Sequence, residues 1–207
     1  MGKRRKSFYK KIEESTDELL FSKDKYPDSN NIKENIPVDD PYITDTVDIN
    51  HSIDDLLVNA LAAHNKNRFD DAISLYTKIL EYNPGDVIRS IIYKHRGMAN
   101  FASSRYELAI EDFNLAFKYD PASYKALYYR GVVRSVLRQY SQAIDDYTLS
   151  LKLHQHQSFC LFRRGQAYYH IGDYPGALAD CESSLSLEPN NQAVEKFIII
   201  LREKLKM

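Results

Sequence analysis

Apolar residues recur at helical spacing along most of the chain after residue 52. In one segment, Ala72, Ile73, Tyr76 and Leu80 occupy positions i, i+1, i+4 and i+8. This spacing places all four side chains on one face of an α-helix, with polar residues on the other. Later segments show the same spacing, so the pattern predicts a succession of amphipathic helices that each bury one face.

The apolar pattern also repeats every 34 residues. The pair Arg96-Gly97 returns as Arg130-Gly131 and Arg164-Gly165. The same step relates three further sets: Tyr106, Tyr140 and Tyr174; Ala109, Ala143 and Ala177; and Asp112, Asp146 and Asp180. Phe69 to Pro84 repeats the second half of the unit, and Pro84 precedes Pro121 by 37 residues, which indicates about one extra turn. The sequence therefore predicts four repeats, at residues 53–86, 90–123, 124–157 and 158–191.

Each repeat is predicted to contain two helices joined by a tight turn. The first helix carries a small residue where two backbones come close, at Ala60, Gly97, Gly131 and Gly165. An aromatic residue opens the second helix, which carries an alanine at an equivalent close approach. Proline ends the pair in three of the four repeats, because it cannot continue a helix.

This pattern resembles the tetratricopeptide repeat family in its period and in its Gly/Ala, Ala and Pro positions, over residues 53–189. The resemblance implies an all-α, right-handed α-solenoid of four helix-turn-helix repeats. The sequence departs from the family pattern at three kinds of position. Gln155 replaces the third proline, and Cys181 occupies a position that is usually a large aromatic residue. Early in the first helix, where a large aromatic residue is also expected, the chain has Leu or Tyr. A final capping helix is predicted at 192–207, because Val194, Phe197, Ile198, Leu201 and Leu205 share a face.

Residues 1–51 differ from the repeats in charge and pattern. The first eleven hold six cations and no acid, whereas residues 12–51 hold eleven carboxylates against three lysines. We expect a disordered tail with a basic tip and an acidic linker, in which residues 7–21 alone have helical spacing. The tip is interpreted as a solubilising end, with a nuclear localisation patch or a contact for nucleic acid or acidic membrane as alternatives. Whether the tail docks on the repeats stays open.

Composition narrows the functional class. The chain has 207 residues, a net charge of −1 and only 7 glycines and 7 prolines, which argues against a glycine-rich nucleotide-binding sheet. No apolar run approaches the ~20 residues of a membrane span, and no secretory signal follows the basic tip. The two cysteines favour a reducing compartment, so the expected location is the cytoplasm, with the nucleus as the alternative.

We find no pattern that predicts catalysis, a cofactor or a metal site. His154 and His156 lie at a repeat junction without further ligands nearby in sequence, and are interpreted as exposed loop residues. Cys160 and Cys181 fall at core positions of the fourth repeat, where buried thiols are inert. The recurring Arg96, Arg130 and Arg164, and the matching aspartates, are interpreted as structural pairs between helices.

The resemblance implies that the first helices line a concave groove that binds a peptide or helix. Carried onto this chain, the expected partner-binding residues are Lys94, His95, Met98, Phe101, Lys125, Tyr128, Tyr129, Phe162, Arg163, Gln166 and Tyr169. Such aromatics among cations suit an acidic partner with apolar anchors. Ile199, on the far side of the capping helix, is a candidate for weak homodimer formation.

The resemblance also permits a test for the family's carboxylate clamp, which grips the acidic C-terminus of heat-shock chaperones. Both of its asparagines are missing here, in either register along the repeats, so a co-chaperone role is disfavoured. We therefore predict a non-enzymatic scaffold or adaptor that binds a protein partner. The alternative is a nucleic-acid-associated adaptor that uses the basic tip and the aromatic groove, although residues 52–207 are balanced at 19 cations and 18 acids.

Overall fold

The computed structural model describes residues 49–206, and over this range it is all-helical. The helices are α2 (Ile49–Asn65), α3 (Phe69–Glu81), α4 (Asp86–Ala102), α5 (Tyr106–Tyr119), α6 (Tyr124–Val136), α7 (Tyr140–Leu153), α8 (Ser158–His170), α9 (Tyr174–Leu187) and α10 (Gln192–Leu205). The basic tip, the helical spacing of residues 7–21 and most of the acidic linker lie outside the described residues. The last three residues of the predicted linker, 49–51, instead form the start of α2.

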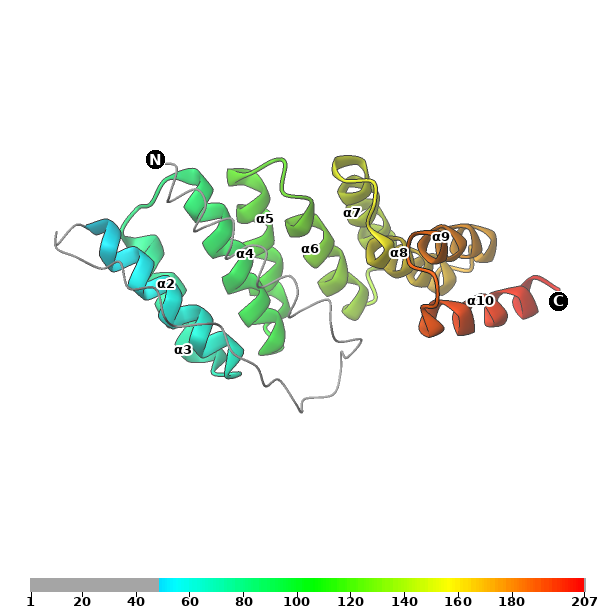
Figure 1. Ribbon diagram of the computed structural model, residues 1–207, viewed down its shortest axis with the longest axis horizontal. Coiled ribbons are helices and arrows are strands. Elements are labelled where there is room, and N and C mark those ends of the chain that lie inside the picture. The colour runs from blue at the N-terminus through cyan, green and yellow to red at the C-terminus, as the bar shows by residue number, and fades with distance from the viewer. Residues whose placement is uncertain (1–48, 207) are drawn as a thin grey trace.

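The helices form a right-handed solenoid, in which each one packs on the next along the chain. Figure 1 shows them side by side in an elongated array, from α2 at one end to α10 at the other. Among the first helices, α6 also contacts α4 and α8. The all-α solenoid expected from the repeat pattern is therefore confirmed.

The turns repeat as regularly as the helices. Three residues join the two helices of each repeat, and their middle residue has left-handed backbone: Asn67, Ser104, Arg138 and Gly172 have φ of 57°, 60°, 59° and 84°. Four residues join one repeat to the next. The longer step from the first to the second repeat is taken up within α4, which is 17 residues long whereas α6 and α8 have 13.

The small residues sit where the two helices of a repeat touch. A Cβ atom at Gly131 would lie 2.7 Å from the Tyr147 ring, and one at Gly97 would lie 2.9 Å from the Phe113 ring. Glycine is therefore required sterically, because a methyl group would overlap a buried ring. The alanines of the second helices, such as Ala109 and Ala143, are fully buried at the same interfaces.

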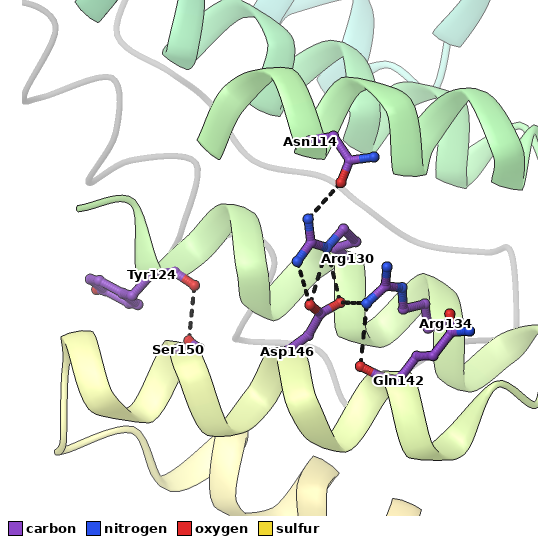
Figure 2. Close-up of polar contacts among 7 residues, drawn as sticks. All are labelled: Asn114, Tyr124, Arg130, Arg134, Gln142, Asp146 and Ser150. Carbon is purple, nitrogen blue, oxygen red and sulfur yellow. Dashed lines mark hydrogen bonds and ion pairs between the residues drawn. The ribbon is translucent and has the colours of Figure 1, made fainter. Parts of the chain in front are cut away.

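The recurring arginines and aspartates form buried ion pairs, as the sequence suggested. Arg96, Arg130 and Arg164 each bond the aspartate sixteen residues later, at shortest distances of 2.7, 2.5 and 2.7 Å. Figure 2 shows the central case, in which Asp146 also accepts from Arg134 at 2.9 Å, while Arg130 donates to Asn114 of the preceding repeat. Each arginine therefore joins three helices: its own, its partner helix and the second helix of the repeat before.

Candidate functional site

Five of the eleven predicted partner-binding residues are buried. Lys94, His95, Met98, Tyr128 and Tyr129 are each less than a tenth exposed. The rings pack between repeats: Tyr129 stacks on Phe113 with 5.7 Å between centroids, and Tyr128 meets Phe159 edge-on at 4.8 Å. These side chains therefore contribute to the cohesion of the solenoid in this structure.

One histidine in each of the first two repeats, His95 and the partly buried His64, is held neutral. His95 stacks on Tyr76, with 6.1 Å between centroids. Burial lowers the pKa of His95 well below its usual value, and the nearby positive charge of Lys94 adds to this effect. Burial likewise lowers the pKa of His64 to about 4. Both imidazoles are therefore uncharged at neutral pH.

The six other predicted residues are partly exposed: Phe101, Lys125, Phe162, Arg163, Gln166 and Tyr169. Phe101 lies against Tyr106 in the second repeat, with 5.8 Å between ring centroids. The remaining five lie on α6 and α8, at the C-terminal half of the array. The accessible part of the predicted site is thus concentrated on the third and fourth repeats.

The capping helix adds a residue to this site. Phe197 of α10 meets the rings of Phe162 and Tyr169, with centroid distances of 5.8 and 5.4 Å. It follows Arg163 by 34 residues, so extending the repeat period by one step identifies it in the sequence. We define the first-helix surface as Lys125, Phe162, Arg163, Gln166, Tyr169 and Phe197.

Two partly exposed cations accompany the rings of the first-helix surface. Nη1 of Arg163 donates to Oε1 of Gln166 at 3.2 Å, which orients the guanidinium along its own helix. Nζ of Lys125 lies 5.7 Å from the centroid of the Tyr124 ring. Rings set among cations offer contact area for apolar side chains and attraction for acidic ones.

The two cysteines and His154 have structural surroundings. Burial raises the pKa of both Cys160 and Cys181 to about 12, so neither provides a thiolate at neutral pH. The ring of His154 stacks on Tyr124 at 4.6 Å. Residues 49–206 contain no group of three side chains arranged to hold a metal ion. No helix in that range has the length and apolarity needed to cross a bilayer.

Sequence models described as tetratricopeptide repeat match three overlapping or adjoining stretches: residues 57–116, 94–158 and 158–191. Together they span about two-thirds of the chain. No curated protein matches the sequence.

Several solved structures share the fold. The MamA protein aligns with a TM-score of 0.69 and 20% identity, over 76% of this chain and 85% of that chain. The first repeat domain of Spaghetti (RPAP3), bound to the HSP90 peptide SRMEEVD, aligns with a TM-score of 0.58 and 24% identity, over 59% and 98%. The second repeat domain of human RPAP3, in complex with the HSP70 peptide SGPTIEEVD, gives 0.55 and 28%, over 57% and 98%.

Proposed function

Because the chain belongs to the tetratricopeptide repeat family, a fold of protein-interaction modules, we propose that it is a non-enzymatic adaptor that binds a partner peptide or helix on its first-helix surface. The observation that carries this proposal is the gathering of partly exposed rings and cations on α6, α8 and α10. Elsewhere along the first helices, the predicted aromatic and basic residues are mostly buried in the solenoid.

The chemistry of this surface favours an acidic partner with apolar anchors. Lys125 and Arg163 attract carboxylates, and the rings of Phe162, Tyr169 and Phe197 offer an apolar contact beside them. Charge attraction mainly speeds encounter, whereas buried rings mainly slow dissociation. Both effects together suit a short segment in which acidic and aromatic or aliphatic residues alternate.

The peptides bound by two of the similar structures support the acidic character of the partner. Both peptides, SRMEEVD and SGPTIEEVD, end in the acidic sequence EEVD. In one register along the repeats, the clamp positions of this chain hold Leu57, Leu61, His95 and Tyr129, and only Lys125 matches the clamp. In the other register they hold Met98, Tyr129 and Phe159, and only Lys94 and Arg163 match. We therefore propose recognition of an internal acidic segment rather than of a chaperone's C-terminal carboxylate.

The free thiols support the cytoplasm as the proposed compartment, with the nucleus as the alternative. Cys160 and Cys181 are both buried and unbridged. Structural disulfides are rare in reducing compartments, and the two thiols here serve as small core residues.

Charge reversal on the first-helix surface tests the proposed function. Lys125→Glu and Arg163→Glu together should reduce recovery of the bound partner by at least about tenfold, as expected when a central charged group becomes repulsive. The matched control is Lys118→Glu with Lys152→Glu, which reverses two exposed lysines on the second helices α5 and α7. Circular dichroism should show the same helix content for both variants.

Two outcomes contradict the proposal. Equal recovery by the two variants would move the site to the second helices or to residues 1–48. Loss of recovery after nuclease treatment, with a steep dependence of binding on salt, would favour the nucleic-acid adaptor instead.

A further inference from the structure

The capping helix α10 continues the repeat register beyond the fourth repeat. Val194 and Leu201 follow Cys160 and Ala167 by 34 residues, and all four side chains are buried. In this register α10 occupies the place of a fifth first helix. Within residues 49–206, no second helix follows it.

One position of each first helix packs against the second helix of its repeat, and in α10 the equivalent position is exposed to solvent. In the second, third and fourth repeats this position is glycine, packed against Phe113, Tyr147 and Cys181 respectively. In α10 the equivalent residue is Ile199, which is 58% exposed. Its neighbour Ile200 is 43% exposed. A large apolar side chain therefore lies exposed on the face of α10 that, in the other first helices, packs against a second helix.

Ile199 lines a shallow hollow between α9 and α10. Leu185 and Ile198 contribute apolar side chains to the hollow, and Glu182, Glu195 and Arg202 contribute charges. Nη2 of Arg202 donates to Glu182 at 3.0 Å, and both side chains are at least half exposed. The face thus combines an apolar centre with charges of both signs.

We propose that this face of α10 binds the same face of a second copy of the chain, with the two helices antiparallel. A second helix packed as in the other repeats is excluded by Ile199, because close approach there needs a glycine or another small residue. A two-fold contact instead places Ile199 beside the same region of the partner, where each isoleucine covers the other.

The charges along α10 complement themselves in an antiparallel arrangement. With the two-fold axis near Ile199, Glu195 of one copy faces Arg202 of the other, and Lys196 faces Glu203. Each of these attractive pairs occurs twice. In a parallel arrangement, the two helix dipoles would be aligned unfavourably.

The contact is short, so the dimer should be weak and in rapid exchange. A helix of 14 residues is about 21 Å long. A single pair of such helices gives an interface at or below the low end of the stable range, which starts at about 1,200 Å². We expect dissociation constants on the order of 10–100 µM for the 207-residue chain.

Sedimentation of the full chain at concentrations from about 10 µM to about 1 mM brackets this affinity. The wild type should pass from monomer to dimer over the range, and Ile199→Lys should remain monomeric. Ile171→Lys is the matched control, because Ile171 is 49% exposed at the turn after α8 and is not part of α10. A monomeric wild type, or equal weakening by both variants, would overturn the proposal.

Two charge variants test the antiparallel geometry itself. Glu195→Arg alone and Arg202→Glu alone should each remain monomeric, because each homodimer would face like charges twice. An equimolar mixture of the two should dimerise, because each copy then meets an opposite charge at both positions. Failure of the mixture to associate while the wild type dimerises would refute the two-fold register around Ile199.

Discussion

Removing the carboxylate of Asp146 should destabilise the protein more than substituting any exposed charged residue on the same helix. Asp146 is 2% exposed and accepts from two arginines, at 2.5 Å from Arg130 and 2.9 Å from Arg134. Asp146→Ala leaves both guanidinium groups without this partner while they are only 16% and 21% exposed. Breaking a buried ion pair by removing one partner costs about 3–5 kcal/mol.

This loss is large against the stability of an ordinary domain, which is about 5–15 kcal/mol. At about 2–4 °C per kcal/mol for a chain of this size, the melting temperature should fall by roughly 6–20 °C. Urea unfolding followed by circular dichroism gives the difference in unfolding free energy directly.

The adjacent Asp145 supplies a matched control. Asp145 is exposed on the same helix, so Asp145→Ala makes the same change in composition and net charge without touching the pair. Its effect should stay within about 0.5 kcal/mol, as is usual for surface substitutions. A loss of less than about 1 kcal/mol for Asp146→Ala would show that the ion pair adds little beyond its desolvation cost.

Two further predictions concern titratable groups that are buried or partly buried. Because the pKa values of His64 and His95 are lowered in the folded state, the unfolded chain binds more protons below pH 6.5. Stability should therefore be complete above about pH 7 and decline as the pH falls toward 4, by up to about 3 kcal/mol from His64. His64→Gln should flatten that dependence in urea titrations, and an unchanged slope would contradict it. Cys160 and Cys181, whose pKa values are raised to about 12, should resist alkylation at pH 8 until the protein unfolds. Rapid modification of either thiol in the native protein, measured by mass spectrometry, would contradict its burial.

The period of the sequence was sufficient to predict the fold, because every repeat uses the same steric contacts. Glycine at residues 97, 131 and 165 marks the close approach of two helices, and the recurring Arg and Asp mark the ion pairs that the structure confirms. These features depend on neighbours at fixed separations, so they are visible in the sequence itself.

The accessible surface could be predicted only in part. Tyr128 and Arg163 both lie on first helices, yet Tyr128 is buried against Phe159 while Arg163 stays partly exposed. Which ring turns into the contact between repeats depends on side-chain packing with the next repeat, and periodicity does not specify it. The apolar stripe of α10 indicates a packing role for Phe197, whereas its side chain stays partly exposed beside Phe162 and Tyr169.

The arginines that each join three helices also determine the order in which the repeats of the solenoid unfold. Each one couples its own repeat to the one before, so opening a middle repeat breaks bonds on two sides. The first repeat has Asn59 and Leu75 where later repeats have the arginine and the aspartate, and so lacks this ion pair of its own. In a linear array of nearest-neighbour units, the least coupled end opens most often. Amide hydrogens of α2 should therefore exchange faster than those of α6 and α7, and unfolding should begin at the first repeat and proceed toward the third.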